Sequence, residues 1–272
     1  MPDLLRHIVA CNNAVLPGER LPFRLDGTQV GWVQPGLVEA LHPHGASLDR
    51  GGVSLPASRL DAATRSLAGT GCFRWHGEAF DVRATPDGPA LTTIDRGAMP
   101  AFGIAASGAH LNGLVRRHDG LWLWVARRAA DKLLDPSKLD HIAAGGVPAG
   151  LTPLQTLVKE AGEEAAIPPD LMQAVQPVAV LSYAMDRPEG LRRDRLHCYD
   201  LMLPGGFVPH PVDGEVEGFE LWPLSQALSR ARDTDDFKFN VNLVLIDLGL
   251  RHGLLDGAEA QHLRSALDAP AS

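Results

Sequence analysis

The stretch that most constrains this chain is residues 145–167, where a glycine turn leads into a helix with a clear start signal. Thr152 is suited to cap the helix, Pro153 to occupy its first position, and Gln155 to complete a Thr-x-x-Gln capping box. Apolar residues then recur at helical spacing along one stripe: Leu154, Leu157, Val158, Ala161 and Ala165. Prolines at 168 and 169 end the pattern. The stretch therefore predicts a capped helix that packs one face against a core.

The same helix carries three acids, Glu160, Glu163 and Glu164, at positions i, i+3 and i+4, so they project to adjoining parts of one surface. Like-charge pairs at these spacings destabilise a helix by about 0.2–0.5 kcal/mol each. Acids near a helix C-terminus also oppose its dipole. A bound divalent cation would reverse these effects, and Mg²⁺ prefers such oxygen ligands. Charge spacing alone leaves two interpretations open, a cation site or a solvated acidic helix end.

The order of glycine turn, capped helix and Lys-Glu-Ala-Gly-Glu-Glu resembles the Nudix box, G-x5-E-x7-R-E-U-x-E-E-x-G-U, where U is aliphatic. In this alignment Gly145 is the first glycine, and Glu160, Glu163 and Glu164 are the metal-binding acids. The positions that depart from the pattern are Leu151 for Glu, Lys159 for Arg and Ala166 for Gly. These departures affect the groups that orient the acids, so they bear on rate and substrate more than on the fold.

The resemblance extends over nearly the whole chain, through residues 23–35, 108–115, 124–168 and 199–221. These stretches are similar to the thiamin-pyrophosphokinase-related Nudix proteins, a subgroup that carries its own N-terminal domain (DUF4743). The resemblance implies an α+β protein with a Nudix α/β/α sandwich built on a mixed sheet. It places a small α+β domain at residues 1–104, the Nudix domain at 105–255, and a C-terminal helix or tail at 256–272.

The resemblance also implies a reaction, the Mg²⁺- or Mn²⁺-dependent hydrolysis of a diphosphate linkage. Thiamin diphosphate or its oxidised analogues are the expected substrates, giving the monophosphate and phosphate. The three acids and the Gly145 carbonyl would hold the metal, and Lys159 would orient an acid. The general base would be Glu164 from within the box, or Glu215 or Glu217 from the later loop. Two alternatives stay open: a nucleoside-diphosphate-linked substrate such as ADP-ribose, and a ligand-binding module that has lost catalysis.

Further candidates for substrate binding lie outside the helix. A basic loop before the glycine turn contributes the candidate diphosphate clamps Arg128, Lys132 and Lys138, for which solubility is the competing interpretation. Glu215 and Glu217 follow a later loop and are further candidates, although acidic strand edges are common. The candidate aromatic wall for the organic half consists of Trp122, Trp124, Tyr183 and Phe207, with burial in the core as the alternative.

Composition restricts the classes of partner. The net charge of −8 over 272 residues disfavours broad attraction to nucleic acid or to anionic membranes, and no apolar run has the length of a membrane span. We therefore expect a small-molecule diphosphate as partner and a monomer or homodimer. Three widely spaced cysteines suit a reducing cytoplasm and form no zinc pattern.

Periodicity and turn signals predict the remaining elements. Alternating apolar residues on both faces of 121–127 indicate a central strand. The other expected elements are a helix at 4–14, a hairpin around 26–28, a helix at 60–67, and strands at 73–82, 110–116, 178–185 and 196–203. A charged turn is expected at 186–195, two helices at 224–231 and 240–251, and a frayed helix from 257.

Overall fold

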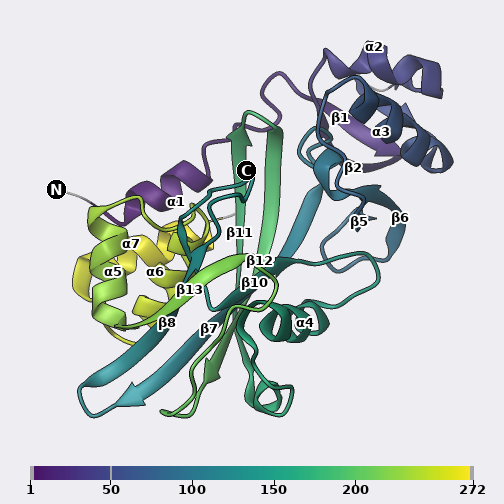
Figure 1. The fold of residues 1–272 in the computed structure, drawn as a ribbon. Helices are drawn as coiled ribbons and strands as arrows, with labels where there is room; N and C mark the ends of the chain where they lie inside the picture. Colours follow the sequence, from purple (N-terminus) through teal and green to yellow (C-terminus); the bar gives the residue numbers. More distant parts are fainter. Residues whose placement is uncertain (1–2, 50, 270–272) are drawn as a thin grey trace.

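The computed structural model describes residues 3–49 and 51–269, and its centre is a seven-stranded mixed sheet (Figure 1). Its main path runs β11–β12–β7–β8–β13, while β10 pairs with β7 and β9 with β8. Strand β12 is parallel to β7, and the other pairs are antiparallel. The strands are β7 Ala105–Arg117, β8 Gly120–Arg128, β9 Leu139–Asp140, β10 Ala143–Gly146, β11 Gln176–Arg187, β12 Gly190–Met202 and β13 Val216–Pro223. The interior position predicted for residues 121–127 is confirmed.

Helices cover both faces of this sheet (Figure 1). Helix α4 (Pro153–Ala165) packs Leu157 and Ala161 against Leu111 of β7. Leu114, of opposite parity on the same strand, belongs to a second core on the other face. That core is covered by α1 (Leu5–Cys11), α5 (Leu224–Asp233), α6 (Val241–Arg251) and α7 (Gly257–Asp268). The predicted α/β/α sandwich is confirmed, because strand alternation gives the sheet two apolar faces.

The N-terminal unit forms a third core beyond one end of the sheet, on the side of α4 (Figure 1). Its strands are β1 Leu21–Leu25, β2 Thr28–Val33, β3 Ser47–Asp49, β4 Gly52–Leu55, β5 Ala79–Arg83 and β6 Ala90–Asp95. Its helices are α2 Leu37–Leu41 and α3 Leu60–Gly69, and its short 3-10 turns are His42–His44, Ala57–Arg59 and Arg96–Ala98. A fourth 3-10 turn, Leu171–Ala174, follows α4 outside this unit. The domain boundaries at 104 and 255 stay a prediction. Helix α1, although it begins the chain, packs in the same core as α6 and α7 and not in the core of the N-terminal unit.

Several local expectations are wrong in a physically informative way. The charged run 186–195 turns only at 188–189, after which Gly190 begins β12. Arg192 donates to Asp194 along β12, and Tyr183 on β11 donates to the same carboxylate across the hairpin, so the strand accommodates its charges. The helix expected to be frayed from 257 runs to Asp268 and buries Leu263 and Leu267, while the expected tail at 270–272 lies outside the described residues. Residues 73–78 are not a strand, and the first helix is shorter than predicted.

None of the helices in the described ranges combines the length and the apolar character that crossing a bilayer requires.

The predicted start of α4 is confirmed in detail. Thr152 Oγ1 accepts a hydrogen bond from the Gln155 amide at 3.2 Å, and Gln155 Oε1 accepts one from the Thr152 amide at 2.9 Å. Pro153 occupies the first turn, where its missing N–H leaves no helical bond unmade. The helix ends at Ala165, and the next residue, Ala166, adopts the left-handed conformation at φ 53°.

Replacing Thr152 with Ala is expected to lower the free energy of unfolding by about 1 kcal/mol, because it leaves the Gln155 amide without its acceptor. Urea denaturation at an unchanged m-value measures this loss. The matched control is Ser265→Ala on the exposed face of α7, expected to stay within about 0.5 kcal/mol of wild type. Equal effects of the two variants would contradict a specific capping role.

Candidate active site

Two carboxylates of α4 lie directly against strand β10. Glu164 is 7% exposed, and its Oε2 accepts a hydrogen bond from the Ala144 amide at 2.9 Å. Glu160, one turn earlier, places its carboxyl group on Gly145, where an added Cβ would lie 2.6 Å from Glu160 Cδ. Only glycine at 145 permits this approach. The structure therefore brings together Gly145, Glu160 and Glu164, as the sequence pattern predicts.

The electrostatics of this pair favour a bound cation. Burial raises the pKa of Glu164 to about 8, and the charges of Asp140, Glu160 and Glu215 act in the same direction against one backbone hydrogen bond. Burial also raises the pKa of Glu160, with Lys159 opposing and Glu163 and Glu215 adding to the shift. Both carboxylates thus lie in a poorly solvated, negatively charged environment. A divalent cation would relieve that cost.

The third acid of the predicted trio lies apart from the other two. Glu163 is half exposed, and its Oε2 accepts a hydrogen bond from Lys159 Nζ at 2.7 Å. This bond raises the pKa of Lys159, whose Nζ also lies 3.7 Å from Glu160 Oε1. The expected convergence of three acids is therefore not seen in the side chains: Glu163 is engaged by the lysine one helical turn before it. Lys159 links Glu163 to the edge of the Glu160 site.

The residues beside β10 fit Mg²⁺ or Mn²⁺ by the chemistry of their donors. Glu160 and Glu164 offer carboxylate oxygens, and Gly145, which lies against the Glu160 side chain, offers a backbone carbonyl. Hard divalent cations prefer such all-oxygen sets and complete them with water and substrate phosphate. Burial raises the pKa of both acids, so a cation bound between them would offset the cost of ionising them there.

Arg128, proposed as a phosphate clamp, has its guanidinium occupied within the protein. Nη1 donates to Asp140 Oδ2 at 2.9 Å, Nε to the Asp135 carbonyl at 3.0 Å and Nη2 to the Leu134 carbonyl at 2.9 Å. The side chain is 12% exposed. A substrate phosphate would have to displace these partners, so the geometry assigns Arg128 to holding the loop after β8.

The other residues proposed from the flanking loops are also engaged. Lys132 pairs with Glu215, and the charge of Glu215 reaches Glu160 and Glu164, so this pair borders the acid site. Glu217 accepts a hydrogen bond from the Ala130 amide at 3.0 Å. Lys138 donates to the carbonyl of Asp235, away from α4. Arg128 also lies near the site through its partner Asp140, whose charge raises the pKa of Glu164 as that of Glu215 does.

The aromatic candidates divide between the two faces of the sheet. Tyr183 is buried in the core beneath α6, on the face opposite α4, and Trp124 is 8% exposed. Trp122 and Phe207 are partly buried against the core on the α4 side. Only these last two retain exposed ring surface on the side where the acids lie.

A buried cluster that the sequence did not indicate lies beneath β10. His110 Nδ1 and His141 Nδ1 are 3.1 Å apart, and together with Asp140 they are the only trio in the described ranges whose ligand atoms lie within 4.8 Å of one another. Asp140 already contacts Arg128 at 2.9 Å and Lys238 at 3.4 Å. Two cations at one carboxylate oppose a further cation, so this metal-compatible trio is a weaker candidate than the acid pair.

The cluster escaped prediction because its histidines are 31 residues apart and meet only through strand pairing. Burial lowers the pKa of His110 well below its ordinary value, and the neighbouring His141 and Lys238 act in the same direction. His110 is therefore a neutral imidazole. One of the two Nδ1 atoms, of His110 or of His141, donates the hydrogen bond that joins the rings.

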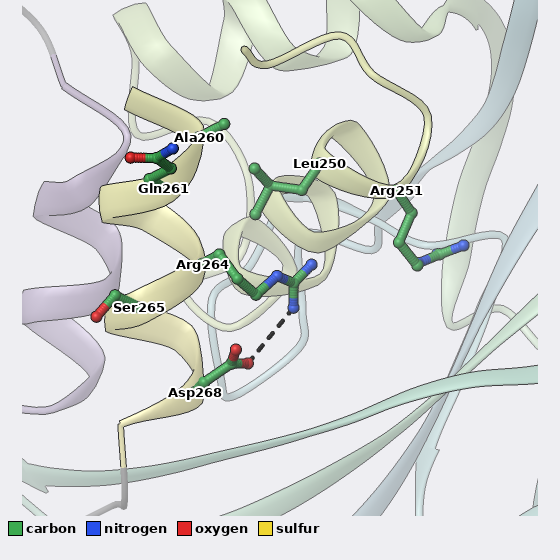
Figure 2. A pocket seen from close by; sticks show the side chains of 7 residues that line it. All are labelled: Leu250, Arg251, Ala260, Gln261, Arg264, Ser265 and Asp268. Atoms are coloured by element: carbon green, nitrogen blue, oxygen red, sulfur yellow. Dashed lines mark ion pairs between the residues drawn. The ribbon is translucent and has the colours of Figure 1, made fainter. Parts of the chain in front are cut away.

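A surface pocket between α6 and α7 lies on the other face of the sheet (Figure 2). Its lining includes Arg264, which pairs with Asp268 at 3.5 Å, and Arg251, which pairs with Asp200 and Asp247. Arg264 also holds Asp247 at 2.8 Å. Both guanidinium groups thus already pair with carboxylates of the protein, whereas the acid site contains carboxylates in need of a cation.

Comparisons with known proteins agree with this geometry. The NUDIX domain model matches residues 109–242. Nudix hydrolase 24, chloroplastic, of Arabidopsis thaliana is 35% identical over 270 residues, which cover 94% of this chain and 74% of that protein. Nudix hydrolase 20, chloroplastic, of the same plant is 40% identical over 178 residues, covering 65% of this chain but only 48% of its own length.

Among solved structures, DR0079 from Deinococcus radiodurans is 20% identical, with a TM-score of 0.48, and covers 62% of this chain and 97% of its own. The extended match to the first plant relative, together with two α4 carboxylates on a glycine turn, places this chain in the Nudix family of hydrolases that act on diphosphate bonds.

Proposed function

We propose that this protein is a metal-dependent diphosphatase of thiamin diphosphate or its oxidised analogues. Water would add to phosphorus and the P–O–P bridge would break, giving the monophosphate and inorganic phosphate. The observation that supports diphosphate hydrolysis is the pair of desolvated carboxylates, Glu160 and Glu164, beside Gly145. The thiamin moiety rests on the likeness of residues 23–35 and 199–221 to the thiamin-related subgroup.

Glu160, Glu164 and the Gly145 carbonyl would hold Mg²⁺ or Mn²⁺. A bound divalent cation neutralises phosphate oxygens and makes a coordinated water a better nucleophile. One oxygen of Glu164 accepts the Ala144 amide, so the carboxyl group is held beside β10. As an ionised carboxylate beside the cation, Glu164 would also accept the proton of the attacking water. Phosphoryl transfer depends mainly on such positioning and charge compensation.

The organic half of the substrate is proposed to contact Trp122 or Phe207. Thiamin carries a cationic ring, and an aromatic face within about 6 Å attracts a cation. Arg117 already lies over Trp122 at 4.2 Å, so a substrate cation on that face of the ring would have to displace this guanidinium.

A substrate panel tests the proposal. Thiamin diphosphate, oxothiamin diphosphate and ADP-ribose are incubated separately with the protein and Mg²⁺, and monophosphate products are measured, with EDTA as the control. We expect Mg²⁺-dependent turnover with a higher kcat/KM for the thiamin compounds. Preference for ADP-ribose would overturn the substrate assignment. Absence of turnover with every compound, despite ligand-induced stabilisation, would instead favour a binding module.

We also propose that the protein works in a reducing compartment such as the cytoplasm. Its three cysteines are free thiols, and Cys11 and Cys198 are buried. Quantifying thiols in protein isolated without reductant tests this, with three thiols per chain expected.

A further inference from the structure

The N-terminal unit is fastened to the glycine loop, which we define as residues 145–150. The Ala149 amide donates to the Ala79 carbonyl of β5 at 2.8 Å, and the Gly150 amide donates to Asp81 Oδ2 at 3.4 Å. The Phe80 ring covers Gly146 so closely that an added Cβ would lie 2.7 Å from Phe80 Cζ. Strand β5 is therefore held against the loop that also positions Glu160.

This attachment brings a charged pair to the acid site. Glu78 precedes β5, Arg96 follows β6, and Arg96 Nη1 donates to Glu78 Oε2 at 2.9 Å. The Arg96 guanidinium lies 5.9 Å from the centre of the Phe80 ring. Glu78 directly precedes Ala79, whose carbonyl accepts the Ala149 amide, and the same glycine loop holds Glu160 at Gly145. The Arg96–Glu78 pair thus borders the proposed metal site from the N-terminal side.

Arg96 differs from Arg128 of the Nudix portion because part of its guanidinium remains exposed and free to donate hydrogen bonds. Arg128 has three internal acceptors, whereas Arg96 is 49% exposed. Within residues 3–49 and 51–269, Arg96 Nε and Nη2 have no protein acceptor. Its partner Glu78 is 36% exposed, and an exposed ion pair of this kind is weak. A guanidinium with a free edge is suited to bind phosphate in a bidentate manner.

We propose that Arg96 of the N-terminal unit is a substrate-binding residue that takes a phosphate of the diphosphate, with Glu78 holding the guanidinium at the site. This inference rests on the proposed function, because it assumes that the acid pair receives a diphosphate. It gives the N-terminal unit a direct part in substrate binding.

The test compares Arg96→Ala with Arg65→Ala in the full chain. Arg65 is a matched control, since it also pairs with a carboxylate, Asp61, and also lies over an aromatic ring, Trp75. For the diphosphate turned over by the wild type, Arg96→Ala is expected to raise KM at least tenfold and to change kcat less than threefold. Arg96→Lys should recover part of the affinity, because it restores charge without the planar fork. Arg65→Ala should match wild type.

A binding measurement separates this proposal from the proposed function. Calorimetry with Mg²⁺ and methylenediphosphonate, which cannot be hydrolysed, should give a Kd at least tenfold higher for Arg96→Ala than for wild type. That result would support Arg96 even if no diphosphate were turned over and the proposed function failed. An unchanged Kd, no binding to wild type, or an equal effect of Arg65→Ala would overturn the proposal. So would a loss of kcat accompanied by a lower melting temperature.

Discussion

Replacing Glu160 with Gln is expected to lower kcat about 10³-fold, a loss of about 4 kcal/mol in transition-state stabilisation. The amide keeps the shape that packs on Gly145 but removes the charge that would hold the cation. The fold should be retained, because burial disfavours the ionised Glu160 carboxylate in the metal-free protein, as its raised pKa reflects, and the neutral amide avoids this cost. Steady-state kinetics at saturating Mg²⁺, together with a thermal melt, measures both effects.

Glu163→Gln is the informative comparison on the same helix. Glu163 is half exposed and engaged by Lys159, so we expect less than a tenfold loss of kcat from its replacement. This ranking differs from the equal roles that the box pattern gives to the three acids. A loss from Glu163→Gln as large as that from Glu160→Gln would show that Glu163 leaves Lys159 to bind the metal, and would contradict the ranking.

The acid helix was predictable because its signals are local. Thr152 and Gln155 specify the cap three residues apart, and the apolar stripe specifies the buried face. The approach of Glu160 to Gly145 follows from the motif, although only coordinates show that a Cβ would collide there. The engagement of Glu163 also had a local signal, since Lys159 lies four residues before it.

The flanking cations could not be assigned from sequence, because their partners are distant in the chain. Arg128 on β8 pairs with Asp140 on β9, and Lys138 donates to the carbonyl of Asp235. Similarly, nothing near Arg96 or Glu78 indicates that β5 lies on the glycine loop. Charge composition identifies which residues are basic, but tertiary contacts decide which of them remain free to bind a ligand.

The metal-free protein is expected to lose stability as pH rises from about 5 to 8, through Glu164. Its pKa is about 8 in the folded protein against an ordinary value of 4.5. Between these values the folded state holds a proton that the unfolded state has released, so the free energy of unfolding falls with pH. The slope from one such group is at most about 1.4 kcal/mol per pH unit. Below pH 4.5 both states are protonated and the effect vanishes.

Urea denaturation in EDTA at pH 5.5, 6.5, 7.5 and 8.5 measures this decline, and Glu164→Gln isolates it because the amide does not titrate. The variant should have the flatter profile, since histidines and other groups contribute equally to both proteins. Mg²⁺ should stabilise wild type most at pH 8.5, where its carboxylate is ionised, and should stabilise the variant less. Parallel profiles in EDTA would show that Glu164 ionises normally in the folded protein, and the desolvated acid pair would then lose its electrostatic reason to bind a cation.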